Sequence, residues 1–207
     1  IVVATSNSHP DNLYRDGLQR ENFVPFIGLI KEKLDILELK VEQDYRLSHL
    51  KSLSTVYYTP LGEDAHHFLQ ATFAELTNEA TFESHMIETQ GRTTCLNKTY
   101  GDVLWTSFNE LCDASLGAAD YLEIVREFST ILMGDIPIFT DENRNGAKRF
   151  MIFIDAVYEH RVKFICCGAV LPEKLYQRKN GAIEFERTVS RLIEMQSEQY
   201  FMQEHLA

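Results

Sequence analysis

The sequence begins IVVATSNSHPDNLYRDGLQR (residues 1–20), and this stretch decides the predicted fold. Its first four residues form an apolar, mostly β-branched run, and the polar step Thr5-Ser6-Asn7 ends that run. An apolar run of this kind is typical of a buried strand in a parallel sheet whose two faces are both covered by helices. In open α/β sheets the ligand lies beyond the carboxyl ends of the strands, so we expect Asn7 at the functional edge.

Several blocks of unusual residue order are spread along nearly the whole chain. They are TSN at 5–7, PDNLY at 10–14, GLQRENFVPFI at 17–27, DYR at 44–46, GRT at 91–93, FNELCD at 108–113, LGAADYL at 116–122, KRF at 148–150 and FERTVSRLIEMQS at 185–197. Together these blocks resemble the ZapE/LACE-type P-loop ATPases. The resemblance implies an α/β fold, namely the C-terminal part of a P-loop (AAA+-like) parallel-sheet ATPase with helices and a small antiparallel β insertion.

The same resemblance implies ATP and Mg²⁺ as cofactors and work on partner proteins. These partners would be cell-division proteins in the bacterial cytoplasm or membrane-protein substrates in the quality control of the mitochondrial matrix. It also implies a homo-oligomer when the protein is full length. The alternative is a non-enzymatic partner-binding module.

One departure from the family pattern limits what residues 1–207 can do. A P-loop needs GxxxxGK[ST], whose backbone N–H groups and Lys hold the phosphates, and none of the ten glycines is followed by Lys. The family's acidic strand end, which holds Mg²⁺, is also missing, since the sequence opens at the next strand. We therefore expect this C-terminal part not to hydrolyse ATP by itself.

The composition argues against several other classes. With 207 residues, of which 44% are hydrophobic and 25% charged, the sequence is typical of a soluble globular protein with one large domain or two small ones. A net charge of −11 argues against a nucleic-acid-binding surface and against an anionic membrane surface. The cysteines lack CxxC spacing, which argues against a zinc site or a disulfide framework and favours a reducing compartment.

We divide the sequence into three segments. Residues 1–46 are predicted to be the C-terminal part of the ATPase core, 47–140 a helical segment with a small β-rich insertion, and 141–207 a helix-strand-helix region. Apolar spacing predicts helices at about 23–34, 65–76, 117–128, 143–160 and 183–200. Short apolar or β-branched runs predict strands at 1–4, 35–41, 56–59, 130–133 and 162–167.

The β-rich insertion is predicted from a hairpin signal. Two strand-like runs, 86–89 and 93–96, flank Gln90-Gly91-Arg92, and Gly supplies the positive φ that a tight turn needs. Residues 103–106 can add a third strand, and we expect the three to form a small sheet that rests on neighbouring helices. After them, Ser107 is predicted to be the N-cap of a short helix in a capping box with Glu110.

Asn7 and Arg20 are the predicted catalytic residues. Asn7 can orient the attacking water or contact the γ-phosphate, although Asn is also a common turn and N-cap residue. Arg20 lies just before a predicted helix, and we expect it to act in trans as an arginine finger on a neighbouring subunit. The alternative for Arg20 is an ion pair with Glu21 or Asp16.

Three other arginines are predicted to bind the nucleotide. The resemblance places Arg46 near the nucleotide-binding side, and Arg46 and Arg15 are rival arginine fingers; the alternative for Arg46 is an ion pair with Asp44. Arg187 and Arg191 are four residues apart on one helix face and can bind phosphate through their planar guanidinium groups. Their alternative is pairing with Glu184, Glu186 or Glu194.

The remaining polar candidates are assigned structural roles. We interpret Asp120 as a buried, hydrogen-bonded carboxylate that holds two helices together. Adjacent His66 and His67 point about 100° apart on a helix, so no metal site is expected there. Cys166 and Cys167 lie in a predicted buried strand, where a thiol behaves as a small apolar group.

Overall fold

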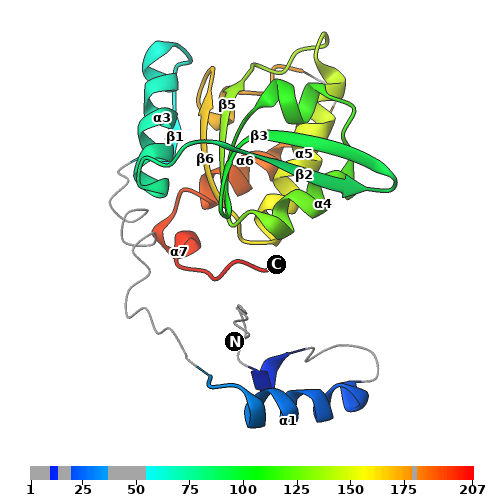
Figure 1. Cartoon of the computed structure of the whole chain (residues 1–207). Coiled ribbons are helices and arrows are strands. Elements are labelled where there is room, and N and C mark those ends of the chain that lie inside the picture. The colour runs from blue at the N-terminus through cyan, green and yellow to red at the C-terminus, as the bar shows by residue number, and fades with distance from the viewer. Residues whose placement is uncertain (1–9, 14–19, 37–54, 179–180) are drawn as a thin grey trace. The chain divides into compact units, whose positions relative to one another are not determined.

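The computed structural model (Figure 1) describes residues 10–13, 20–36, 55–178 and 181–207. The chain divides into two compact units, residues 1–43 and 44–207. Helix and strand labels are those of Figure 1.

The first unit contains two 3-10 turns, η1 (Pro10–Asn12) and η2 (Arg20–Asn22), followed by helix α1 (Val24–Lys33). The predicted helix is confirmed, and Pro25 lies in its first turn, where no N–H is needed. Within the predicted apolar stripe, Ile27 is buried whereas Phe26 remains half exposed. The predicted strand 1–4 and residues 37–41 of the predicted strand 35–41 lie outside the described residues.

The second unit is built on one six-stranded sheet with the order β1-β6-β5-β4-β3-β2. Its strands are β1 (Tyr57–Tyr58), β2 (Glu83–Thr89), β3 (Arg92–Tyr100), β4 (Val103–Ser107), β5 (Thr130–Ile136) and β6 (Lys163–Gly168). β1, β6, β5 and β4 are parallel, and β3 and β2 extend the sheet in antiparallel fashion. The predicted mixed α/β class, with parallel strands, helices and a small antiparallel part, is confirmed.

The position of the antiparallel strands corrects one detail of the prediction. They do not form a separate small sheet, because β4 pairs with β3 on one side and with β5 on the other. β4 can take this central place because Val103, Leu104 and Trp105 are all buried, so that both faces of the strand are covered. Segments 47–140 and 141–207 thus share one sheet, and the three-segment division stays a prediction.

Helices cover both faces of this sheet. Helix α3 (Glu63–Thr77) packs on one face, where Leu69 and Phe73 meet Leu132 of β5 and Ile165 of β6. Helices α4 (Ala118–Glu127) and α5 (Arg144–Glu159) cover the other face, and Figure 1 shows α3 apart from them. Helix α6 (Ala182–Glu194) packs on α5. Among the described helices, none is both long and apolar enough to cross a membrane.

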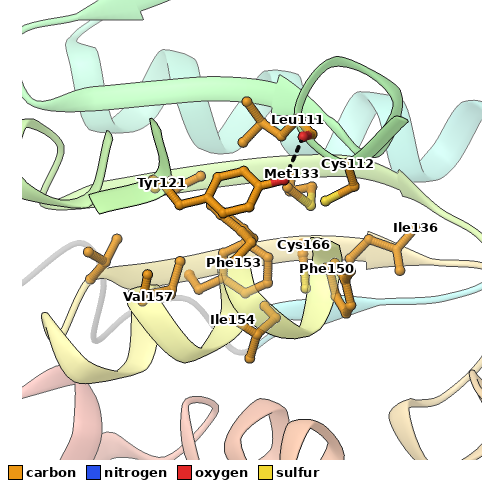
Figure 2. Packing of buried hydrophobic residues seen from close by; sticks show 14 of the residues in the cluster. Leu111, Cys112, Tyr121, Met133, Ile136, Phe150, Phe153, Ile154, Val157 and Cys166 are labelled. Atoms are coloured by element: carbon orange, nitrogen blue, oxygen red, sulfur yellow. Dashed lines mark hydrogen bonds between the residues drawn. The ribbon is translucent and has the colours of Figure 1, made fainter. Parts of the chain in front are cut away.

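The larger core lies between the sheet and α4 and α5. Figure 2 shows Tyr121 of α4 beside Phe153 of α5, with ring centroids 5.5 Å apart. The Tyr121 hydroxyl donates to the carbonyl oxygen of Leu111 at 2.9 Å, so this buried phenol is satisfied. Cys166 lies in the same core and Cys167 faces α3; burial raises the pKa of the Cys167 thiol to about 12, in agreement with a structural role.

Two local predictions differ in outcome. The capping box is confirmed: Ser107 Oγ accepts from the N–H of Glu110 at 3.3 Å, and a Glu110 carboxylate oxygen accepts from the N–H of Ser107 at 2.9 Å. The helix that follows is the π-helical turn η3 (Asn109–Asp113). The single last helix predicted at 183–200 is wrong, because Ser197 caps a new short helix, α7 (Glu198–Phe201), by accepting from the N–H of Tyr200.

Candidate functional site

Arg20 begins the turn η2 at the entrance to α1. One guanidinium nitrogen, Nη2, donates to the carbonyl oxygen of Asp11 at 2.7 Å, and the buried Nε has no hydrogen-bond acceptor among the described residues. Among the described residues, Arg20 forms no ion pair with Glu21, and Asp16 lies outside them. The guanidinium is therefore oriented by a neutral carbonyl rather than neutralised by a carboxylate, which leaves its charge uncompensated by the described part of the chain.

Three other predicted site residues lie outside the described residues. They are Asn7, Arg46 and Arg15. Their assigned roles stay predictions, as does the role of Arg20.

Arg187 and Arg191 project from α6 towards acidic side chains of α5. Arg191 forms ion pairs with Asp155 and Glu159, and its side chain is only 11% exposed. Arg187 lies 3.7 Å from the same two carboxylates and is more exposed. The predicted ion-pair alternative named acidic residues of the same helix; the structure instead pairs the arginines across the helix interface. A phosphate at this place would have to compete with two carboxylates, so phosphate binding stays a prediction here.

Asp120 is buried, and one carboxylate oxygen, Oδ2, accepts two hydrogen bonds. The donors are the N–H of Gly117 at 2.8 Å and the Arg92 guanidinium at 2.9 Å. Its other oxygen, Oδ1, is buried and has no hydrogen-bond partner among the residues that the structure describes. The predicted buried carboxylate is present, but it joins the start of α4 to β3 rather than joining two helices. Arg92 accordingly belongs to β3, not to the hairpin turn.

A cavity of about 220 Å³ lies at the carboxyl ends of the central parallel strands. Its walls come from the ends of β4, β5 and β6 and from the first turns of α3, and Lys98 of β3 also lines it. Ligands in open α/β sheets bind at this edge. The sequence alone does not predict this cavity, because its residues come from six separate elements without a common motif.

Trp105 and His66 form the aromatic part of the cavity lining. Their ring centroids are 5.4 Å apart, and the Lys98 ammonium lies 4.7 Å from the indole centroid. His66 and His67 are both exposed. Within the described part of the chain no cluster of His, Cys, Asp and Glu is arranged to hold a metal ion.

A mostly parallel sheet covered by helices on both faces, with a cavity at the carboxyl ends of its parallel strands, places the protein among the open α/β folds. The chain belongs to the AFG1-like ATPase family, whose sequence profile matches residues 1–204. This result confirms the resemblance on which the sequence predictions were based.

Two relatives show how much of the family protein the chain contains. It is 35% identical to lactation elevated protein 1 homolog B of Danio rerio, over 98% of this chain and 47% of that protein. It is 34% identical to the cell division protein ZapE of Escherichia coli K12, over 100% of this chain and 55% of that protein. The chain thus spans about half the length of the curated relatives it matches. No solved structure matches it.

Proposed function

We propose that residues 1–207 are part of an ATPase that binds and hydrolyses ATP to act on partner proteins. The observation that carries the proposal is membership of the AFG1-like ATPase family along 1–204. Because residues 1–207 contain no GxxxxGK[ST], the phosphates and Mg²⁺ are held mainly by residues outside this stretch, and the stretch does not hydrolyse ATP alone.

In this proposal Arg20 completes the site of a neighbouring subunit. An arginine finger stabilises charge on the transferred phosphoryl group and is typically worth about 10³–10⁵ in rate. The Asp11 carbonyl supports this role, because a hydrogen bond to a neutral acceptor orients the guanidinium without adding a negative charge beside it. The role requires a homo-oligomer in which Arg20 of one subunit reaches the γ-phosphate of the next.

Asn7 acts in cis on the water or on the γ-phosphate, and Arg46 contributes to nucleotide binding. A phosphate-binding role for Arg187 and Arg191 has less support, since α5 already supplies two carboxylates to them. The partners are proteins: the E. coli relative is named a cell division protein, which supports a division role if this chain is bacterial. A eukaryotic chain would act in the mitochondrial matrix.

Asn7 provides the first test. In the full-length protein, Asn7→Ala should lower the rate of ATP turnover far more than the affinity for ATP, because the amide acts on the reacting atoms rather than on the bound ground state. Asn12→Ala, five residues further along the sequence, is the matched control. Unchanged turnover of Asn7→Ala would reduce Asn7 to a capping residue, and turnover by residues 1–207 alone would refute the assignment of the phosphate site.

A second candidate, a partner-binding module without chemistry, is favoured by the missing P-loop pattern. It predicts partner binding that is independent of ATP. A full-length sequence that contains GxxxxGK[ST] decides against it.

A further inference from the structure

The cavity at the carboxyl ends of β4, β5 and β6 has two opposite charges in its lining that are not paired with each other. Lys98 comes from β3 and Asp135 from the end of β5. β4 lies between these two strands, which are therefore two strand spacings, about 10 Å, apart, and Asp135 lies about three residues further along the sheet than Lys98. In the described part of the chain neither side chain forms an ion pair or a side-chain hydrogen bond. Each charge is therefore free to meet a ligand in the cavity.

The Lys98 side of the cavity favours an anion. The ammonium lies over the indole of Trp105 and 6.0 Å from the ring of Phe82, which holds it in place without neutralising it. The N-terminus of α3 also opens here, and Gly62 as the N-cap offers no side-chain acceptor to the first-turn N–H groups. These N–H groups can donate to an anion, while Glu63 and Asp64 of the first turn offset the positive end of the helix dipole.

The Asp135 side of the cavity favours an N–H donor. Asp135 has a left-handed backbone (φ 62°) beside a register shift between β5 and β6, and such costly conformations cluster at functional sites. The second acid in the lining, Glu110, is partly occupied, because its oxygen Oε2 accepts from the N–H of Ser107 and the hydroxyl of Thr106. Among the described residues, neither oxygen of Asp135 accepts a hydrogen bond, so Asp135 is the more available acceptor; the two carboxylates together disfavour a phosphate dianion.

The rest of the lining fits a small apolar group. Leu61, Ala65 and Leu69 line the cavity on the α3 side. A volume of about 220 Å³ is below the roughly 300–1,000 Å³ of cavities that hold drug-sized ligands, and it suits about one amino-acid residue.

We propose that this cavity binds an α-carboxylate with an adjacent N–H donor and a small apolar side chain, which is the chemistry of the last residue of a polypeptide. Lys98 and the N-terminus of α3 bind the carboxylate, Asp135 accepts the N–H, and the apolar residues of α3 contact the side chain. A free apolar amino acid has the same chemistry, so the test includes both. The inference rests on the proposed function for its biological meaning, since it gives the ATPase a docking site for partner proteins.

Binding is measured without nucleotide by calorimetry of the full-length protein. The probes are acetyl-Ala-Ala-Leu with a free carboxylate, the same peptide with a C-terminal amide, free leucine, and inorganic phosphate. Trp105 is the only tryptophan of residues 1–207, so its fluorescence in that chain gives a second, local readout. We expect the free-acid peptide to bind and to change the fluorescence of Trp105, and the amide to bind about tenfold to a hundredfold more weakly.

Variants of the two charged residues identify the site. Lys98→Met should weaken binding of the free-acid peptide by about tenfold or more, and Asp135→Asn, which tolerates the left-handed backbone, should also weaken it. Lys174→Met and Glu142→Gln change exposed charges elsewhere and should leave binding unchanged. Circular dichroism checks that each variant is folded.

The binding results distinguish a polypeptide C-terminus from a free amino acid as the ligand, and either of these from no carboxylate site. Binding of leucine but not of the peptide supports the chemistry and assigns it to a free amino acid. Equal binding of the acid and amide peptides, binding of phosphate alone, or no binding at millimolar concentration overturns the inference. Normal ATP turnover without peptide binding overturns the inference only, whereas peptide binding by a full-length protein without turnover overturns the proposed function only.

Discussion

Replacing Asp120 by Ala removes one carboxylate that connects helix α4 to strand β3. The variant loses the hydrogen bond from the Gly117 N–H, which caps the helix, and a cap of this kind contributes about 0.5–2 kcal/mol. It also loses the ion pair with Arg92, whose side chain is 56% exposed, so we count this pair as a surface pair worth about 0.2–1 kcal/mol. The expected decrease in the free energy of unfolding is therefore about 1–3 kcal/mol.

Removing the exposed partner, Arg92, should lower the free energy of unfolding nearly as much as removing the buried Asp120. Arg92→Met leaves the Asp120 carboxylate buried with one donor fewer, and the expected decrease in the free energy of unfolding is about 1–2 kcal/mol. Because both variants break the same interaction, the double variant should be little less stable than Asp120→Ala alone, with a coupling energy above about 0.5 kcal/mol. Arg126→Met, which breaks the exposed pair with Glu123, is the matched control and should lose about 0.3–0.5 kcal/mol.

Urea unfolding monitored by circular dichroism measures these four variants, with ATP turnover of the full-length protein measured in parallel. A stability loss with proportionate effects on turnover agrees with a structural Asp120. Additive single-variant effects would show that the hydrogen bonds to Asp120 are not coupled. Turnover abolished at unchanged stability would show that Asp120 takes part in the chemistry and would refute the structural interpretation.

Two further predictions concern packing and pH. Gly146→Ala should lower the free energy of unfolding, measured by urea unfolding, by about 1–3 kcal/mol. The reason is that the added Cβ would lie 2.8 Å from an Asp113 oxygen and 2.9 Å from the Phe108 ring. An unchanged free energy of unfolding would mean that the start of α5 can shift to make room. Burial, aided by Arg161, lowers the pKa of Lys163 to about 8. Between about pH 8 and 10 the unfolded chain therefore binds more protons than the folded chain. As the pH rises through this range, the wild type should gain stability relative to Lys163→Met. Stability curves that stay parallel over this pH range would show that Lys163 titrates normally.

Local sequence signals predicted much of the second unit. The helices at 65–76, 117–128 and 143–160 carry apolar residues at helical spacing, and each is present within a few residues. Glycine at position 91 predicted the hairpin turn, where Gln90 and Gly91 both have positive φ. The Ser107–Glu110 box was equally readable, since its two residues are three apart and need no tertiary information.

Features that depend on tertiary pairing were not readable in the same way. The sequence does not show that β4 pairs with β5, and therefore does not show that the hairpin extends the main sheet. Arg191 could have met acids of its own helix by spacing alone, and only the packing of α6 on α5 brings it to Asp155. The cavity could not be predicted for the same reason. Lys98 and Asp135 are 37 positions apart in the sequence, and only the strand order brings both to the same cavity.

The central claim is that Arg20 completes the ATPase site of a neighbouring subunit, and a subunit-mixing assay of ATP turnover tests it most directly. Full-length Arg20→Ala should bind ATP with nearly unchanged affinity and lose about 10³-fold or more of its turnover. Lys33→Ala, which removes an exposed cation of α1 that pairs with Glu32, is the control and should stay active. When Arg20→Ala is mixed with a variant whose P-loop is inactive but whose Arg20 is intact, part of the activity should return. Near-normal turnover of Arg20→Ala alone, or no recovery on mixing, would contradict a role in trans.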